Sequence, residues 1–477
     1  MIFKKPFTLF LALSAALTFL LVAADSLPAQ EAQPMPVFSW DRVPQYMHIR
    51  KAKNFTEDEI KYLASFPLVT FEKTTGSQTF QSTEDGTLAA AKAVKEVNPS
   101  TKILYYRNVI VHYGSYKANS EIDNMPEAFL VGQNGKTKLI RNRMNQEAYN
   151  LTNPAVRNWW VGNARQLCAE PVIDGLFLDG IVKTLTPSYL KRDIGVKKVD
   201  ELVAGYNTMM DETREAIGPD KLMIANVLRV SLPDSGLVAM KKFDGSYIEH
   251  FEGSWGDKEA KRNSLAKAIE AFQKAAREGY LIALTVGLSE LDGGDGKSNP
   301  GQLDEIRVGM DEKANFTKRL NYILSLFLIC AEKYSYFMPH DGYNADTSKV
   351  WMTRIPELER PLGPPKGPAV QDGYIYTREF AHAKVRVDIE NEVGEIEWLD
   401  PATGVAAPLI GSTPDEAQEN PKQKQFNKLD ADKSGTLTMA EYTSRNPSPE
   451  REAAFTARDT DKDSSLTFVE FSTPPAK

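Results

Sequence analysis

The feature that most restricts the fold is an alternation of short apolar runs with longer amphipathic segments between residues 45 and 338. The runs are too short for helices and are bounded by turn residues, so they predict buried strands. We expect eight strands, at 45–50, 68–72, 102–107, 175–179, 221–226, 246–250, 280–286 and 334–338. Strands that alternate with helices indicate an α/β fold, and eight of them predict a closed (β/α)8 barrel, the TIM barrel.

The segments between these strands contain the signals that begin and end helices. Thr56 and Glu59 form a predicted capping box, and Asn153 followed by Pro154 predicts the start of another helix. Helices are also expected at 199–217, before Gly218, and at 258–277. An insertion at 129–139 contains an Asn-Gly pair, which predicts a β-hairpin.

The first 29 residues have the order of a secretory signal peptide. Lys4 and Lys5 precede an apolar stretch, which small residues follow, and cleavage is expected after Ala24 or Ala29. We therefore expect a protein that is secreted, periplasmic or held at the cell surface. The apolar stretch is long for a signal, so an uncleaved membrane anchor is the alternative.

The rest of the chain divides into a barrel at 36–345, a small all-β domain at 346–410, a linker at 411–425 and a C-terminal module at 426–477. Strands of the β domain are expected at 350–355, 373–378, 383–388 and 394–399. A formal net charge of −7 argues against a nucleic-acid partner. Cys168 and Cys330 lie in apolar helical segments, which indicates buried thiols.

The C-terminal module contains two acidic loops of the same pattern. A hard cation such as Ca²⁺ takes six to eight oxygen ligands, and a terminal Glu supplies two of them. This module resembles a paired EF-hand, and the resemblance implies calcium as a partner and cofactor in a structural or tethering role. The expected ligands are Asp430, Asp432, Ser434, Thr436 and Glu441 in the first loop and Asp459, Asp461, Asp463, Ser465 and Glu470 in the second. Ser464 stands where the first loop has Gly435, so we expect strain and weaker binding in the second loop.

Polar side chains follow the predicted strands at their carboxyl ends, where the active sites of parallel barrels lie. Asp179 and Glu249, on the fourth and sixth strands, are the pair that glycoside hydrolysis requires. One carboxyl group protonates the leaving oxygen, and the other attacks the anomeric carbon or activates water. This chemistry requires no cofactor. Substrate contacts are expected from His48, Glu72, Arg107, Asn226, His250 and Trp255.

Three of these assignments have alternatives. Trp255 is either a platform for a sugar ring or a rim or core residue. Glu252 and Glu72 are alternatives to Glu249 as the catalytic acid. Glu72 could equally form a structural ion pair with Lys73.

Two motifs carry a family resemblance. The segments 150–160, Asn-Leu-Thr-Asn-Pro-Ala-Val-Arg-Asn-Trp-Trp, and 174–179, Asp-Gly-Leu-Phe-Leu-Asp, resemble the pattern of the hypothetical glycosyl-hydrolase-like TIM barrels. More distantly, the barrel is similar to retaining α-galactosidase-type barrels, which place the nucleophile on strand four and the acid/base on strand six. That resemblance implies Asp179 as nucleophile and Glu249 as acid/base. Glu249 stands where those families have Asp, which leaves the stereochemical outcome open.

The sequence therefore predicts a secreted glycoside hydrolase that acts on an oligo- or polysaccharide. One alternative is a carbohydrate-binding barrel without catalysis. Another is a metal-dependent amidohydrolase-type barrel, because four of the five histidines lie near strand exits. The first strand ends in His48-Ile-Arg50, however, and lacks the paired histidines of such a metal centre.

Overall fold

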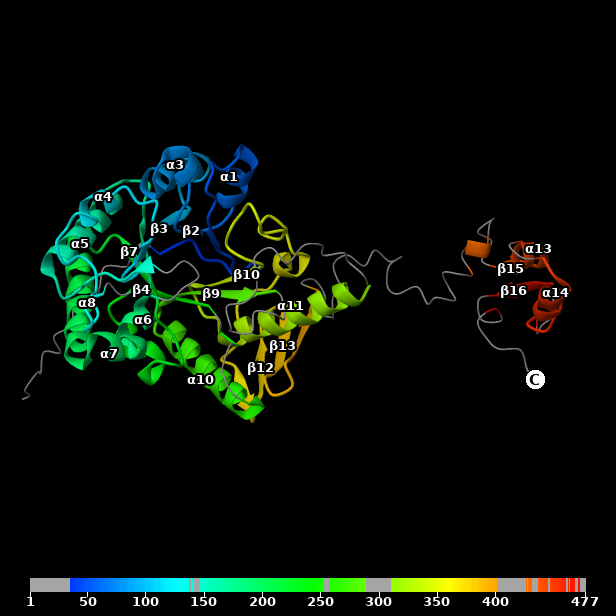
Figure 1. The fold of residues 1–477 in the computed structure, drawn as a ribbon. Coiled ribbons are helices and arrows are strands. Elements are labelled where there is room, and N and C mark those ends of the chain that lie inside the picture. Colours follow the sequence, from blue (N-terminus) through cyan, green and yellow to red (C-terminus); the bar gives the residue numbers. More distant parts are fainter. Residues whose placement is uncertain are drawn as a thin grey trace, which may run out of the picture.

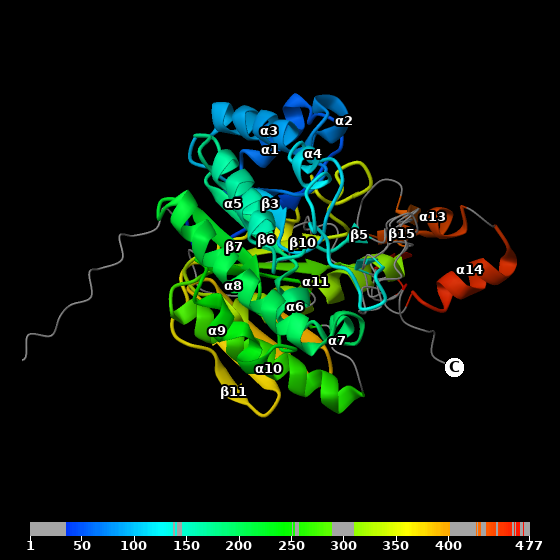
Figure 2. The same cartoon turned by 60° about the vertical axis from the view of Figure 1, so that its left-hand side comes forward.

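The protein is represented by a computed structural model, shown in Figures 1 and 2. It describes residues 35–136, 139–140, 146–249, 251–252, 257–288 and 310–400, and in the C-terminal module residues 426, 428–430, 436–444, 447–459, 462, 464–467 and 471. The predicted signal at 1–29 and linker at 411–425 lie outside the described residues.

Eight parallel strands form one sheet in the order β1-β2-β3-β6-β7-β8-β9-β10. Their bounds are β1 (Met47–Ile49), β2 (Leu68–Phe71), β3 (Lys102–Asn108), β6 (Gly175–Asp179), β7 (Leu222–Asn226), β8 (Gly245–Ile248), β9 (Leu281–Gly287) and β10 (Ser335–His340). A parallel bridge between Gln45 and Phe337 brings the last strand beside the first, and Phe337 N–H donates to Pro44 O at 2.8 Å. The predicted (β/α)8 barrel is confirmed, with strand ends displaced by a few residues at most.

Helices cover the outer face of this sheet, as both ribbon views show. They are α1 (Glu57–Leu63), α2 (Ser77–Phe80), α3 (Thr83–Val97), α4 (Asn119–Ile122), α5 (Pro154–Cys168), α6 (Ile181–Leu185), α7 (Ser188–Ile194), α8 (Val196–Ile217), α9 (Leu237–Met240), α10 (Lys258–Arg277) and α11 (Met310–Cys330), with a short 3-10 helix η1 (Pro233–Gly236). Within the described part of the chain, none of the helices has the length and apolarity that crossing a bilayer demands.

The predicted helix signals act as expected. Thr56 and Glu59 form a reciprocal capping box at the start of α1. The Asn153 side chain accepts from Ala155 N–H, and Pro154 occupies the first turn of α5. Helix α8 begins three residues earlier than predicted and ends at Gly218, whose φ of 82° suits glycine.

The insertion at 129–139 differs from the prediction. A tight turn does form at its Asn-Gly pair, where Gly132 N–H donates to Lys136 O at 2.7 Å. Phe129, however, pairs with Tyr149, and β4 (Leu139–Ile140) pairs with β5 (Gln146–Glu147). The insertion therefore takes its pairing partner from farther along the chain than a two-residue hairpin would.

Beside the barrel lies a four-stranded antiparallel sheet in sequential order. Its strands are β11 (Val370–Asp372), β12 (Ile375–Glu379), β13 (Ala383–Asp388) and β14 (Val393–Trp398). The strand predicted at 350–355 is wrong, because Trp351 and Ile355 are buried while the three residues between them are exposed. That spacing does not fit the alternation of a strand. The segment instead leads into a 3-10 helix, η2 (Pro356–Glu359).

The small sheet packs on α11, and its side chains join the same hydrophobic core as the barrel. A Cβ atom at Gly394 would lie 2.5 Å from the backbone of Tyr322 in α11, so only glycine fits there. Buried Arg378 of β12 donates to Leu328 O at 3.1 Å, to Ala331 O and to the Glu332 carboxylate. Its guanidinium thus caps carbonyl groups at the C-terminal end of α11.

The C-terminal module has a core of its own. Its elements are β15 (Thr436–Thr438), α13 (Met439–Thr443), α14 (Pro449–Thr456) and β16 (Ser465–Thr467). The two short strands pair antiparallel, with Leu437 opposite Leu466. The core residues are Phe426, Leu429, Leu437, Tyr442, Phe455, Leu466 and Phe471.

Replacing Arg378 with Met is expected to destabilise the protein by about 3 kcal/mol, because buried carbonyls and the Glu332 carboxylate lose their donor. Thermal or urea unfolding measures the effect. Arg386→Met, in the neighbouring strand, is the matched control: its pair with Glu395 is exposed at 3.5 Å, and the expected change is within about 0.5 kcal/mol. Equal effects from the two changes would contradict the capping role.

Candidate active site at the carboxyl ends of the strands

Asp179, the last residue of β6, lies at the mouth of the barrel and accepts three hydrogen bonds. Its Oδ2 accepts from Tyr106 OH at 2.7 Å and from Asn108 Nδ2 at 3.2 Å, and its Oδ1 accepts from Asn226 Nδ2 at 3.2 Å. Tyr106 and Asn108 are two residues apart on β3, so both face the barrel interior. All three donors are neutral groups.

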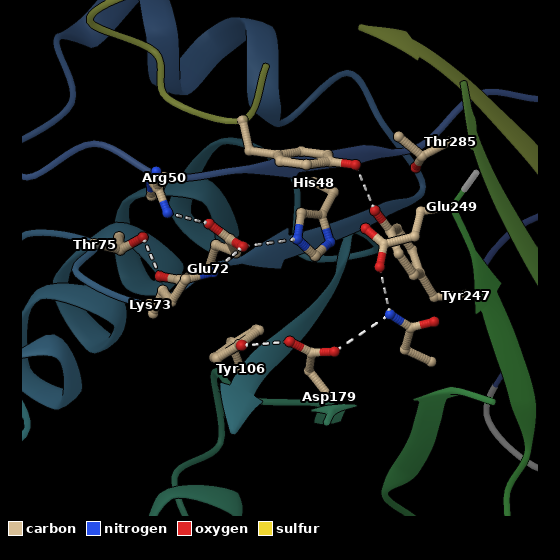
Figure 3. A network of polar contacts seen from close by, with 12 residues as sticks. His48, Arg50, Glu72, Lys73, Thr75, Tyr106, Asp179, Tyr247, Glu249 and Thr285 are labelled. Atoms are coloured by element: carbon tan, nitrogen blue, oxygen red, sulfur yellow. Dashed lines mark hydrogen bonds and ion pairs between the residues drawn. The ribbon is translucent and has the colours of Figure 1, made fainter. Parts of the chain in front are cut away.

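Glu249 follows β8 and is joined to Asp179 through Asn226, the last residue of β7 (Figure 3). The Asn226 amide nitrogen donates to Asp179 Oδ1 at 3.2 Å and to Glu249 Oε1 at 2.9 Å. Because one atom touches both, these two carboxylate oxygens are at most about 6 Å apart. Arg229 Nη2 lies 3.3 Å from the same Glu249 oxygen. The predicted carboxylate pair is thus brought together by one side chain.

Glu72, after β2, lies in a separate group of charges at the mouth (Figure 3). Its carboxylate accepts from Arg50 Nη1 at 2.9 Å and from the Lys73 ammonium, and His48 Nε2 lies 3.8 Å away. Burial alone would raise the pKa of Glu72, but Lys73, His48 and Arg50 outweigh it and hold that pKa well below its usual value. The Lys73 ammonium also lies over the ring of Tyr106, 4.8 Å from its centroid. Glu72 was predicted as a substrate contact, as a rival acid or as an ion-pair partner, and the geometry favours the ion pair.

Tyrosines from several strands complete the mouth. Tyr247 OH lies 2.7 Å from Tyr343 OH, and Tyr46 OH is hydrogen-bonded to Thr285. Burial raises the pKa of Tyr343 and of Tyr247 well above the usual value, and the Glu249 carboxylate adds to the effect on both. These phenols therefore stay protonated and act as neutral donors at any working pH.

An aromatic layer closes the barrel beneath these groups. The Phe177 ring lies 4.7 Å from the His48 ring, 5.0 Å from that of Tyr247 and 5.6 Å from that of Tyr106. Burying such a ring stabilises the fold by roughly 2–3 kcal/mol. Phe177 and Asp179 share one face of β6, so the strand that supplies the carboxylate also supplies the floor of the site.

Two of the described residues singled out from the sequence, Arg107 and Glu252, do not join this group. Arg107 is 1% exposed and lies behind β3, with its guanidinium 4.8 Å from the Tyr116 ring and 5.4 Å from the Trp159 ring. Glu252 is held by both ends of the Arg319 guanidinium, which removes it as a rival acid. The predictions for His250 and Trp255 lie outside the described residues.

Sequence reasoning missed several contributors, namely Tyr106, Arg229, Tyr247 and Tyr343. Strand alternation could have found two of them. Tyr247 is two residues before the predicted Glu249, and Tyr106 is two before Asn108, so each faces the same side of its strand as a residue that contacts the carboxylate pair or belongs to it. The same alternation turns Arg107 away.

The predicted calcium ligands are only partly covered by the described residues. Among the described residues, no three His, Cys, Asp or Glu side chains gather closely enough to hold a metal ion. Of the predicted calcium ligands, Asp430, Thr436, Glu441, Asp459 and Ser465 are described, and Asp432, Ser434, Asp461, Asp463 and Glu470 lie outside. Ser464 has a φ of 70°, as expected for a residue that replaces a loop glycine.

Residues 95–384, more than half of the chain, match the model of a family described as hypothetical glycosyl hydrolase family 15. A comparison with curated proteins finds no significant match.

Among solved structures, the chain is similar to the glycoside hydrolase domain of PelA from Pseudomonas aeruginosa, with 13% identity, 52% of this chain and 85% of that chain covered, and a TM-score of 0.36. It is also similar to a maltogenic alpha-amylase, AmyB, from Thermotoga neapolitana, with 12% identity, 73% of this chain and 86% of that chain covered, and a TM-score of 0.42. An alpha-amylase from Anoxybacillus has 13% identity to the chain, with 73% of this chain and 87% of that chain covered and a TM-score of 0.41. Structural similarity at this level carries no functional inference. The assignment of the chain to a glycoside hydrolase family therefore rests on the family match and on the chain's own residues.

Replacing Glu72 with Gln is expected to lower the free energy of unfolding at pH 7 by about 3 kcal/mol, because Arg50 and Lys73 lose a buried counter-charge. The pKa of Glu72 is lowered on folding, so its stabilising effect is full above the ordinary pKa of 4.5 and is lost as the pH falls below that value. Urea unfolding at several pH values should therefore show the difference between parent and variant shrinking on acidification. Glu57→Gln, in an exposed pair with Lys61, is the control and should change little at any pH.

Proposed function

The chain belongs to hypothetical glycosyl hydrolase family 15, and we propose that it cleaves the glycosidic bonds of an oligo- or polysaccharide with Asp179 as nucleophile and Glu249 as general acid and base. The observation that carries this proposal is the single Asn226 amide that donates to both carboxylates. Two carboxyl groups on opposite sides of one scissile bond are what the reaction requires.

The spacing of the pair favours a retaining mechanism. Retaining enzymes hold their two carboxyl groups about 5–5.5 Å apart, whereas inverting enzymes leave about 6.5–9.5 Å for a water molecule. The two oxygens bound by Asn226 are at most about 6 Å apart, which is below the separation typical of inverting enzymes. We therefore propose a double displacement.

In the first step, Glu249 gives its proton to the glycosidic oxygen while Asp179 Oδ1 attacks the anomeric carbon. The bond from that carbon to the leaving oxygen breaks, and a glycosyl ester of Asp179 forms. In the second step, ionised Glu249 takes a proton from water, whose oxygen attacks the same carbon and releases Asp179 as a carboxylate.

The environments of the two carboxylates support this division of roles. Asp179 accepts three hydrogen bonds from neutral donors, which orient the carboxylate for attack, and no cation is among these donors. The Glu249 side chain is 30% exposed, so it can exchange its proton with solvent between the two steps.

The walls of the mouth suit a sugar ring. Tyr113 and Tyr343 are half-buried and offer aromatic ring surface, and aromatic faces pack against the apolar faces of pyranoses. Lys73 and Arg50 retain donors beyond those used on Glu72, because an ammonium has three and a guanidinium five. These groups supply hydrogen bonds to hydroxyl or other oxygen substituents.

Sugar release from a panel of polysaccharides and aryl glycosides tests the pair. Asp179→Asn and Glu249→Gln are each expected to lower kcat/KM by at least three orders of magnitude while the unfolding midpoint stays close to that of the parent. Glu252→Gln is the matched control, and its activity should stay within a few-fold because Glu252 is engaged by Arg319. The anomeric configuration of the first product, followed by NMR, should be that of the substrate. Binding without hydrolysis by the parent, or equal losses in all three variants, would refute the assignment.

We also propose that the C-terminal module binds calcium as a paired EF-hand and that the chain is exported. The antiparallel pairing of β15 with β16 supports the first, since it places loop positions of the two acidic segments side by side. The fit of the donor set supports it too, because Asp430, Thr436, Glu441, Asp459 and Ser465 all offer oxygen, the atom that Ca²⁺ prefers. The order of residues 1–29 supports export.

Ser464→Gly is expected to tighten calcium binding about fivefold. Left-handed backbone costs a residue with a Cβ about 1 kcal/mol, which glycine does not incur. Calorimetric titration of calcium into chelator-treated protein measures the change. Ser464→Ala removes only the hydroxyl and keeps the Cβ, so it should bind no more tightly than the parent. A gain in both variants would point to the hydroxyl instead of the backbone.

A further inference from the structure

The Asn226 side chain occupies an unusual position between the two reacting carboxylates. It is 6% exposed, and its amide oxygen has no hydrogen-bond partner among the described residues. A buried amide oxygen without a partner costs about 1–3 kcal/mol of folding free energy. We therefore expect the amide nitrogen of Asn226 to have a role that offsets this cost. Because both neighbours of the nitrogen are carboxylate oxygens, which only accept, the nitrogen must be the atom that faces them.

We propose that Asn226 is a positioning residue that sets both the separation and the protonation of the catalytic pair. This inference rests on the proposed function of Asp179 and Glu249. One amide nitrogen has two hydrogens at a fixed angle, so each carboxylate is held by one of them. Neither carboxylate can move without weakening its own bond.

The same contacts decide which oxygen of Glu249 carries the proton. Oε1 accepts from Asn226, and Arg229 Nη2 lies 3.3 Å from it. Both neighbours can only donate, which disfavours a proton on Oε1 of neutral Glu249 and favours one on Oε2. A general acid must present its proton in one direction, and Asn226 makes Oε2 the proton-bearing atom before substrate arrives.

Asn226 also links the two steps of the reaction. When Asp179 forms its glycosyl ester, it loses its charge and becomes a weaker acceptor. The amide then donates more strongly to Glu249, which favours the ionised form that acts as base in the second step. The acid and base roles of Glu249 thus alternate with the charge of Asp179.

Other charged and titratable groups also face this pair, and all of them except Tyr106 are left unchanged in the test. Those near Asp179 are Tyr106, Tyr113 and Lys73. Those near Glu249 are Arg229, Tyr46, Tyr247 and Tyr343.

The test compares the pH dependence of kcat/KM for the parent, Asn226→Ala and Tyr106→Phe. The acidic limb reports ionisation of Asp179 and the basic limb reports protonation of Glu249. Losing a donor to a carboxylate raises its pKa, so Asn226→Ala should move both limbs upward by about one pH unit. Tyr106→Phe removes a donor from Asp179 alone and should move only the acidic limb.

Asn226→Asp, which keeps the shape of the side chain, provides a second variant if the alanine variant does not fold. A third carboxylate there should move both limbs upward by more than one unit. An unchanged pH profile, or a loss confined to KM, would overturn the proposal and make Asn226 a substrate contact or a purely structural residue.

If the parent hydrolyses nothing, the proposed function fails but the role of Asn226 is still decided. Carbon-13 NMR titration of the Asp and Glu carboxyl groups then follows Asp179 and Glu249 directly, with their signals identified by loss in Asp179→Asn and Glu249→Gln. Asn226→Ala should raise both pKa values. If it raises neither, the positioning role is excluded independently of catalysis.

Discussion

The whole mouth depends on the closure of a parallel sheet by its first and last strands. The bond from Phe337 N–H to Pro44 O brings β1 beside β10. Closure puts His48 within ring contact of both Tyr247 and Tyr343, at 5.1 and 5.2 Å. In an open sheet, exits of the first and last strands would be separated by the width of the sheet, and no common site would exist.

Within this mouth, the buried carboxylate of Glu72 and the half-buried one of Asp179 are stabilised in different ways. Glu72 is surrounded by cations, which fix its charge and make it part of the framework. Asp179 is held by a phenol and two amides, which compensate for lost water but leave the charge intact. The first arrangement produces stability and the second leaves a group able to react.

Much of the fold could be predicted from the sequence because parallel barrel strands are uniform, short and punctuated by turns. The strand predicted at 350–355 was wrong because Trp351 and Ile355 bury themselves against the barrel, a contact that local pattern cannot reveal. The pair Asp179 and Glu249 was predictable from strand exits, while their connection through Asn226 was not. That connection depends on the stagger between neighbouring strands, and it exists only once the strands are paired.

The attachment of the small sheet has a consequence for how the molecule can be divided. Helix α11 belongs to the barrel by sequence, yet its last carbonyls bind Arg378 and its surface admits Gly394 only because glycine has no side chain. A gene fragment cut at residue 345 would therefore uncover the outer side of a barrel helix. The natural unit for expression, fusion or exchange between relatives extends to about residue 400, and the catalytic module should be cloned with the sheet attached.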